Sequence, residues 1–499
     1  MDKQTELEEQ INVDLGSLLS DPTLLRSQAY IAGEWIDSKS NKTFNVTNPA
    51  TSQIITAVPD LGVEETRTAI DAAYEAQKTW SIKTGKERAA IIQKLYHLMV
   101  EHADDLAKIL TAEMGKPLSE AKGEITYGAS FLEFFAEEAK RIYGETIPGH
   151  QSDKKLLVIK QPIGVVTSIT PWNFPNAMIT RKLGPALAAG CTFVAKPAAE
   201  TPLSALAIAV LAERAGLPKG VFSMVTSKQS KLIGEEFCSN AKVRKLTFTG
   251  STEVGRVLLK QGAEQVLKMS MELGGNAPFI VFDDADLDSA VEGAIISKYR
   301  NNGQTCVCAN RIYVQEGVYD SFSEKLSKAV EKFHIGNGFD DNVTLGPLIT
   351  DDAVLKVEEH IKDALSKGAN LVSGGKRHSL GGSFFEPTIL TEVSKEMIVA
   401  TDETFGPVAP LFRFRDEEDV IHQANDTIFG LAAYFYAKEL SRVWRVSEAL
   451  EYGMVGVNTG LISTELAPFG GVKQSGLGRE GSRHGIEEFL EMKYICMSV

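Results

Sequence analysis

The stretch TFVAKPAAETPLSALAIAVLAERAGLPKGVFSMV, residues 192–225, places a long apolar segment between two short ones. The short runs 192–196 and 221–225 are rich in β-branched and aromatic residues, which predicts buried strands. The residues between them, 204–216, predict a helix that ends at Gly216, because glycine commonly closes helices. A strand, a helix and a second strand in this order predict a βαβ unit with parallel strands.

The same alternation continues on both sides of this stretch. The runs VVTSIT (165–170), KLTFT (245–249) and PFIVF (278–282) predict further buried strands, and a second alternating series follows residue 310. We therefore predict an α/β fold with two α/β domains, in a chain whose length is typical of about two to four domains.

Composition and charge exclude several classes of protein. The chain has 499 residues, a formal net charge of −14 and a sequence pI near 5.2, which disfavours binding to nucleic acid or to anionic membranes. No apolar run approaches the roughly 20 residues that a membrane-spanning helix needs. We expect neither nucleic acid nor a membrane as a partner.

The cysteines and the first residues indicate the compartment. Five cysteines, an odd and small number, predict a reducing environment without a disulfide framework. The acidic opening MDKQTELEEQ fits neither a secretory signal nor a transit peptide. We expect a cytoplasmic protein.

The segment NNGQTCVCANR, residues 301–311, holds two of these cysteines, Cys306 and Cys308. A zinc site needs about four ligands, and the eight histidines form no HxxxH pair, so we predict no metal. Either cysteine could instead pack as a small buried apolar side chain. The segment is polar and contains glycine, which favours a loop that presents a nucleophilic thiol. Residues 287–300 predict the helix that leads into this loop.

Three other stretches carry residue types that fit such a nucleophile. Glu272 precedes a double glycine and a strand, where it could act as a general base or be a solvated loop residue. Asn173 follows a predicted strand, where it could donate to an oxyanion or belong to a turn. In FTGSTEVGR (248–256), Gly250 and Ser251 precede a predicted helix whose N-terminus could bind phosphate or be merely capped.

These stretches, together with FVAKPAAETP (193–202), TDETFGPVAP (401–410) and PFGGVKQSGLGREG (468–481), resemble the aldehyde dehydrogenase superfamily in the same order. The resemblance extends from about residue 27 to the end of the chain. It implies that Cys306 attacks the aldehyde carbon and that Asn173 and the backbone N–H of Cys306 bind the oxyanion. It also implies that Glu272 activates the water that hydrolyses the resulting thioester.

The resemblance also implies a nicotinamide cofactor and the residues that bind it. The adenosine ribose would contact Lys196, the pyrophosphate Gly250 and Ser251, and the nicotinamide ribose Glu403 and Phe405, while Trp172 and Leu273 would line the site. Many NAD-using members have a glutamate where this chain has Ala199. The absence of this carboxylate favours NADP, because a carboxylate at this position would repel the 2′-phosphate of NADP. Glu200 is adjacent, so NAD stays open.

Residues 178–191, 299–311 and 460–481 resemble the succinate-semialdehyde dehydrogenase branch. That likeness implies that Arg181, Arg300 and Ser463 bind the substrate carboxylate, for which arginine is suited by its two parallel donors. We expect NAD(P)-dependent oxidation of succinate semialdehyde to succinate. Glutarate semialdehyde and aldehydes in general are the alternatives. The resemblance to members with the same CVC run implies that Cys308 could form a reversible disulfide with Cys306.

Other readings remain possible for the sequence. They are a cysteine hydrolase, a non-catalytic member of the family and a coenzyme A-acylating relative. No evident histidine partner supports a cysteine hydrolase, and Glu272 argues against a coenzyme A-acylating enzyme.

The resemblance implies a Rossmann-like cofactor domain at residues 21–144 and 165–274 and a catalytic domain at 275–482. A small β oligomerisation arm would comprise 145–164 and 483–499, in a homodimer or homotetramer.

Overall fold

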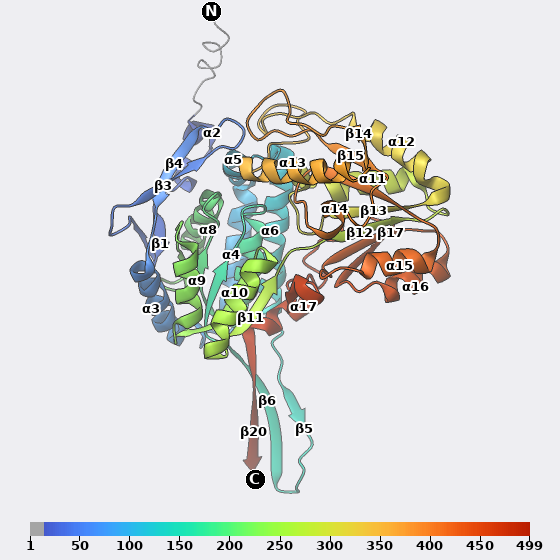
Figure 1. Ribbon diagram of the computed structural model, residues 1–499. Coiled ribbons are helices and arrows are strands. Elements are labelled where there is room, and N and C mark those ends of the chain that lie inside the picture. The colour runs from blue at the N-terminus through green and yellow to red at the C-terminus, as the bar shows by residue number, and fades with distance from the viewer. Residues whose placement is uncertain (1–13) are drawn as a thin grey trace, which may run out of the picture.

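The predicted βαβ stretch forms the middle of an eight-stranded sheet in the computed structural model, which describes residues 14–499 (Figure 1). The acidic opening of the chain therefore lies outside the described residues. This first sheet has the order β19-β11-β10-β7-β8-β9-β1-β2. Its strands are β1 (Ala29–Ile31), β2 (Glu34–Ile36), β7 (Val165–Ile169), β8 (Thr192–Lys196), β9 (Phe222–Met224), β10 (Val243–Thr249), β11 (Lys268–Glu272) and β19 (Gly476–Leu477).

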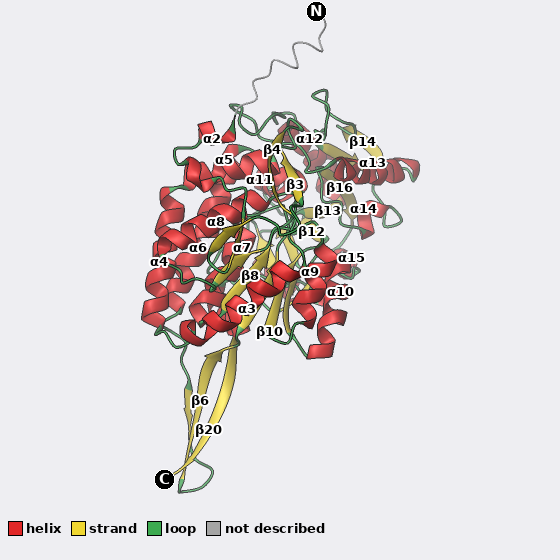
Figure 2. Ribbon diagram, turned by 90° about the vertical axis from the view of Figure 1, so that its left-hand side faces the viewer, coloured by secondary structure: helices red, strands yellow, loops and turns green. Residues whose placement is uncertain are grey.

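The central strands β11, β10, β7, β8 and β9 are parallel, as the alternation of strands and helices predicts. All residues of β8 and β9 are buried, which is typical of parallel strands covered on both faces. Figure 2 shows helices on both sides of this sheet. They are α3 (Val63–Trp80), α4 (Gly85–Glu101), α5 (Ala103–Met114), α6 (Leu118–Glu138), α7 (Ala177–Ala189), α8 (Pro202–Ala215), α9 (Ser230–Ser239) and α10 (Thr252–Gly262).

The second α/β series forms a seven-stranded sheet with the order β14-β15-β16-β13-β12-β17-β18. Its strands are β12 (Ala277–Val281), β13 (Ala309–Gln315), β14 (Asn370–Ser373), β15 (Thr388–Thr391), β16 (Val408–Phe414), β17 (Ala432–Tyr436) and β18 (Met454–Val457). The helices of this part are α11 (Leu287–Tyr299), α12 (Tyr319–Val330), α13 (Asp351–Ser366), α14 (Ile398–Thr401), α15 (Glu417–Asn425) and α16 (Leu440–Ala449). Shorter elements complete the body: α2 (Leu15–Leu18), β3 (Thr43–Thr47), β4 (Ile54–Pro59) and α17 (Ser482–Gly485).

A three-stranded antiparallel sheet projects from the body as an arm (Figures 1 and 2). It consists of β5 (Glu145–Ile147), β6 (Lys154–Pro162) and β20 (Leu490–Ser498), and β20 pairs with β6 along its whole length. Met492 and Tyr494 on β20 are exposed. The domain limits given above stay a prediction, and β19 joins the first sheet although those limits assign it to the catalytic domain.

None of the helices described between residues 14 and 499 is long and apolar enough to cross a bilayer. In the same part of the chain, no three or more His, Cys, Asp or Glu side chains gather in a way that could hold a metal ion.

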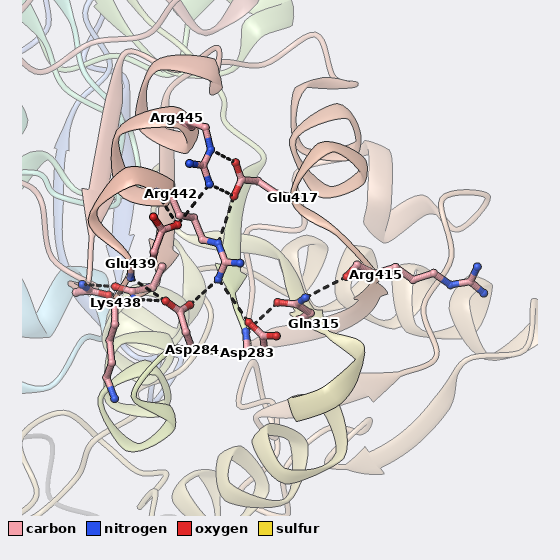
Figure 3. Close-up of polar contacts among 11 residues, drawn as sticks. Asp283, Asp284, Gln315, Arg415, Glu417, Lys438, Glu439, Arg442 and Arg445 are labelled. Carbon is pink, nitrogen blue, oxygen red and sulfur yellow. Dashed lines mark hydrogen bonds and ion pairs between the residues drawn. The ribbon is translucent and has the colours of Figure 1, made fainter.

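A network of ion pairs ties α15 and α16 to the end of β12 (Figure 3). Arg442 contacts Asp284 at 2.7 Å and Glu417 at 3.2 Å, and its guanidinium lies 4.6 Å from the ring centre of Phe282. Asp284 also accepts hydrogen bonds from the backbone N–H groups of Lys438 and Glu439. One arginine thus connects three segments that are far apart in the sequence.

We expect Arg442→Ala to lower the free energy of unfolding by about 1–3 kcal/mol, because it leaves partly buried carboxylates without their cation and removes the ring contact. Urea denaturation followed by circular dichroism measures this loss. Arg415→Ala is the matched control, since the Arg415 side chain makes no ion pair among the described residues and only its carbonyl accepts a bond from Gln315. Equal losses of unfolding free energy in Arg442→Ala and Arg415→Ala would contradict a stabilising role for the ion-pair network.

Candidate active site

The loop with the predicted nucleophile follows α11 through a tight, buried turn. Asn301 and Asn302 have left-handed φ values of 52° and 55°, and Gly303 follows with a φ of 76°. A Cβ on Gly303 would lie 2.2 Å from the carbonyl oxygen of Gly406, so only glycine fits there. The turn carries the chain to Cys306, which is half-buried and a free thiol.

Cys306 lines a cavity of about 310 Å³ between the two sheets. Segments from both sheets contribute to its wall. Of the residues predicted from the sequence, the cavity brings together Trp172, Asn173, Gly250, Ser251, Leu273, Cys306, Glu403 and Phe405. The rings of Trp172 and Phe405 meet edge to face, 5.5 Å apart. The predicted nucleophile, the predicted oxyanion donor and six of the predicted cofactor residues therefore lie at one place. The predicted residues Glu272, Lys196 and Ala199 are not part of the lining of this cavity.

Asn173 is buried and faces the nucleophile loop. Its Nδ2 donates to the carbonyl oxygen of Gln304 at 3.1 Å, two residues before the thiol. The backbone carbonyl oxygen of Asn173 accepts hydrogen bonds from Lys116 Nζ at 2.7 Å and from Asn301 Nδ2 at 3.0 Å. The side-chain amide is thus held beside the backbone that carries Cys306, as an oxyanion donor must be.

Glu272 ends β11 with its carboxylate buried, and neither oxygen has a hydrogen-bond partner among the described residues. Burial and the nearby carboxylate of Glu480 raise its pKa well above the usual range, while Arg181 and Lys182 oppose this shift. A carboxylate with a raised pKa takes up a proton readily near neutral pH, which suits a general base.

Sequence reasoning missed Lys182 and Glu480, which form a buried ion pair. Arg181 also pairs with Glu480, and its guanidinium lies 4.0 Å from the ring centre of Phe469. The available signal was the apolar run AMITRKLGPALAA around Arg181 and Lys182, because a lysine in a helix that is buried all round needs a partner, and every residue of α7 is buried. Arg181 is thus beside the cavity but already holds one carboxylate, with its Nη2 still unpartnered.

Arg300 and Ser463 do not line the cavity of Cys306. They line a second, smaller pocket, together with Thr305 from the nucleophile loop. A further residue that sequence reasoning missed, Tyr127 of α6, has a buried hydroxyl without a partner among the described residues. Arg181, Arg300 and Cys306 all lie close enough to influence the pKa of Tyr127, which burial raises. No local pattern distinguishes this tyrosine from one that only packs.

Most of the residues predicted for the cofactor lie at or just after the carboxyl ends of parallel strands, where α/β proteins bind dinucleotides, whereas Glu403 and Phe405 lie on the segment between α14 and β16. Gly250 follows β10, and Ser251 caps α10 by accepting from Val254 N–H at 3.3 Å. Lys196 ends β8, and among the described residues its Nζ is bound only to the Pro197 carbonyl oxygen; burial lowers its pKa to about 8. A buried cation with so few partners fits an anionic group of a dinucleotide.

Glu403 is held at the other side of the cavity by the double glycine. Its Oε1 accepts from Gly275 N–H at 3.1 Å, and burial raises its pKa to about 7. A Cβ on Gly274 would lie 2.9 Å from Glu403 Oε2. Ala199, on the loop after Lys196, is half-buried and places no carboxylate there.

Cys308 is buried. Its Sγ lies 3.5 Å from the carbonyl oxygen of Lys298, and the thiol is free. A disulfide between Cys308 and Cys306 therefore stays a prediction.

We expect Gly275→Ala to lower kcat by about 10- to 100-fold, because small displacements of reacting groups cost rate steeply. A Cβ at this position would lie 2.4 Å from the carbonyl oxygen of Cys306 and would push the nucleophile loop away. Steady-state assays of cofactor reduction measure the loss. Gly317→Ala, where a Cβ meets nothing within 4 Å, should keep the native rate; unchanged activity in Gly275→Ala would contradict the close packing.

Comparisons with known proteins identify the family of the chain. The model of the aldehyde dehydrogenase family matches residues 35–495. The chain is 66% identical to a glutarate-semialdehyde dehydrogenase of Pseudomonas aeruginosa, over 96% of this chain and 99% of that one. It is 65% identical to a succinate-semialdehyde dehydrogenase [NADP(+)] of Escherichia coli, over 96% of this chain and all of that one.

A solved structure has the same fold as this chain. The crystal structure described as an E. coli NADP-dependent enzyme superposes with a TM-score of 0.96 at 65% identity, covering 96% of this chain and 100% of that one. The order of motifs, the cavity that joins them and these likenesses over nearly the full length lead to one conclusion. The chain belongs to the aldehyde dehydrogenase family.

Proposed function

We propose that this protein oxidises succinate semialdehyde to succinate with NADP, through a thioester on Cys306. The observation that carries the proposal is the convergence of Cys306 and Asn173 at one cavity, with Glu272 ending β11 directly before Leu273, which lines the same cavity. The relative from E. coli, 65% identical, is named for this substrate and this cofactor.

The chemistry follows from the positions of these side chains. Burial raises the pKa of the Cys306 thiol to about 12, and the positive charge of Arg181 opposes this shift and favours the thiolate. The thiol first loses its proton to solvent. The thiolate then attacks the aldehyde carbon, and the oxygen that becomes negative accepts hydrogen bonds from Asn173 and from the backbone N–H of Cys306. A nicotinamide held by Glu403 and Phe405 would supply the hydride acceptor, and departure of the hydride from the tetrahedral carbon would leave a thioester on Cys306.

Hydrolysis of the thioester needs a base. Glu272 takes a proton from water as the water oxygen attacks the thioester carbonyl, and the Cys306 sulfur leaves with the release of the acid. Glu480 raises the pKa of Glu272 towards the working range of such a base, and Lys182 holds Glu480 in place.

A site for the substrate carboxylate lies beside this machinery. We assign Arg181, Arg300 and Ser463 to that carboxylate. We add Tyr127, because its hydroxyl has no partner among the described residues and both arginines act to lower its pKa. Arginine binds carboxylates through two parallel donors, and a buried hydroxyl without a partner is suited to donate to the same group.

The test compares succinic semialdehyde with butanal, which has the same four-carbon chain but no carboxylate. We expect kcat/KM to favour succinic semialdehyde by about 10²-fold or more, since charged hydrogen bonds in a buried site are worth about 1.5–3 kcal/mol each. The rate of NADPH formation measures both values. Nearly equal values would mean that the arginines are structural and that the protein is a general aldehyde dehydrogenase.

Glutarate semialdehyde is the second candidate substrate, favoured by the relative from P. aeruginosa, which is named for it. One additional methylene changes binding by only about 1–3 kcal/mol in an apolar pocket. The same assay with both semialdehydes ranks them.

NADP is preferred to NAD in this proposal because of Lys196 and Ala199. No carboxylate at position 199 opposes a 2′-phosphate, and the phosphate would restore the charge that burial disfavours on Lys196. Glu200 is exposed and acts on the same lysine, so NAD is the alternative cofactor.

We also propose that the arm joins subunits of a homodimer or homotetramer. The exposed apolar side chains of β20, among them Met492 and Tyr494, support an interface there. The predicted domain limits belong to this proposal, as does a cytoplasmic location, which the five free cysteines support. In such a compartment Cys308 could act as the redox partner of Cys306.

A further inference from the structure

Lys116 lies in the turn between α5 and α6 and is 2% exposed, although it belongs to neither the cavity nor the predicted site. Its Nζ contacts Glu124 Oε2 at 2.6 Å and the carbonyl oxygen of Asn173 at 2.7 Å. The same nitrogen lies 3.8 Å from the ring centre of Phe174. Each of these contacts goes to α6 or to the segment that carries the oxyanion donor.

Two carboxylates of α6 extend this arrangement. Glu124 Oε1 accepts from the backbone N–H groups of Asn176 at 2.9 Å and Ala177 at 3.2 Å, where α7 begins. Glu120 Oε2 accepts from the backbone N–H of Asn301 at 2.8 Å, in the turn that leads to Cys306. Residues 116–124 therefore bind both the segment of Asn173 and the nucleophile loop.

The two segments come from different sheets. Asn173 follows β7 of the first sheet, whereas Cys306 precedes β13 of the second. An oxyanion hole built from the Asn173 amide and the Cys306 backbone N–H works only if the distance between these two donors is fixed, because such donors act through preorganised geometry. The contacts of residues 116–124 cross this junction.

Stability alone does not account for a buried lysine here. Desolvation of two buried ions costs several kcal/mol per ion, and a well-packed apolar pair of similar volume is often equally stable. What an apolar pair cannot do is donate a short, directed hydrogen bond to the Asn173 carbonyl. The ion pair of Lys116 and Glu124 thus fixes the position of the Asn173 backbone, which apolar packing alone would hold less firmly.

We propose that Lys116 is a positioning residue, which holds Asn173 against the nucleophile loop and so keeps the two oxyanion donors from the two sheets at a working distance. The inference rests on the proposed function, since it takes Asn173 as an oxyanion donor. Glu124 holds the ammonium of Lys116 in place, and Glu120 fixes the other side of the junction.

A double-mutant cycle tests this role, with Lys116→Met, Asn173→Ala and the double variant. The readout is kcat/KM for succinic semialdehyde, with stopped-flow measurement of the first turnover of NADPH. We expect Lys116→Met to cost about 10- to 100-fold in the native background and less than about 3-fold in the Asn173→Ala background, because its effect passes through that amide. The dissociation constant for NADP should be unchanged in all three.

Equal losses from Lys116→Met in both backgrounds would overturn the inference alone and make Lys116 a structural residue. A loss in Lys116→Met with none in Asn173→Ala would overturn the oxyanion role of Asn173 as well. Failure of the positioning role of Lys116 can therefore be told apart from failure of the proposed role of Asn173.

Lys245→Met is the matched control for burying an uncharged side chain in place of a lysine. Lys245 is equally buried and contacts Ser270 and Glu488, away from the cavity. It should lose stability in urea with little change of kcat/KM. If Lys116→Met does not fold, the same cycle with Glu124→Gln, which keeps an acceptor for α7 but removes the ion pair, decides the question by the same criterion.

Discussion

Replacing Cys306 with alanine is expected to lower kcat for aldehyde oxidation by at least about 10⁴-fold, as removal of a covalent nucleophile does. Hydride leaves a negatively charged tetrahedral alkoxide much more readily than it leaves a neutral aldehyde. Without the thiol, no such alkoxide forms on the enzyme. The cavity of Trp172 and Phe405 stays intact, so NADP should still bind, which quenching of tryptophan fluorescence measures.

Cys308→Ala is the control for this prediction. Its thiol contacts the carbonyl oxygen of Lys298, and its removal should change kcat by no more than a few-fold. The pair of variants also separates the dehydrogenase from a cysteine hydrolase, because only the dehydrogenase forms NADPH in step with aldehyde consumption. A Cys306→Ala protein within 10-fold of the native rate would refute the thioester mechanism.

Replacing Glu272 with glutamine is expected to lower kcat by about 10²- to 10⁴-fold, the usual range for loss of a general base. The first turnover should survive, because attack by the thiolate and formation of the thioester do not need this carboxylate. Rapid mixing should therefore show one equivalent of NADPH per active site, followed by a slow steady state. Lost turnover without this burst would instead place Glu272 in the activation of Cys306.

The pH dependence of the native enzyme should follow the raised pKa of Glu272. Burial and Glu480 favour the protonated carboxyl, and only the ionised form can accept a proton from water. The hydrolysis step should therefore slow as the pH falls through that raised pKa and speed up as the pH rises. In Glu272→Gln this limb of the kcat profile should be absent, which steady-state rates between pH 5 and 9 can measure; an unchanged profile would assign the limb to another group.

The fold could be predicted in the segments where burial determines the residue types at neighbouring positions. The runs 165–170, 192–196 and 245–249 are short and rich in β-branched and apolar residues, and they contribute β7, β8 and β10 to a parallel arrangement. Gly216 ends α8 with a left-handed φ of 85°. Such features depend on neighbours within a few residues, so the amino-acid sequence contains them directly.

The buried charges could not be predicted in the same way. Lys182 pairs with Glu480, 298 residues away, and Lys116 bonds to Asn173, 57 residues away. A lysine in a printed sequence resembles a solvated one until the fold buries it and supplies its partner. Arg181 shows the same difficulty, because its likeness to a substrate-binding arginine said nothing of the bond to Glu480.

Strand β19 and Glu480 come after every other strand of the two sheets in the chain, since β18 ends at Val457. On a ribosome, the first sheet therefore stays open at its β11 edge until residues 476–480 have been made. Until then Glu480 is not available to Arg181 and Lys182, which disfavours burial of α7. The nascent chain thus completes this reaction centre only after the strands of both sheets have been synthesised.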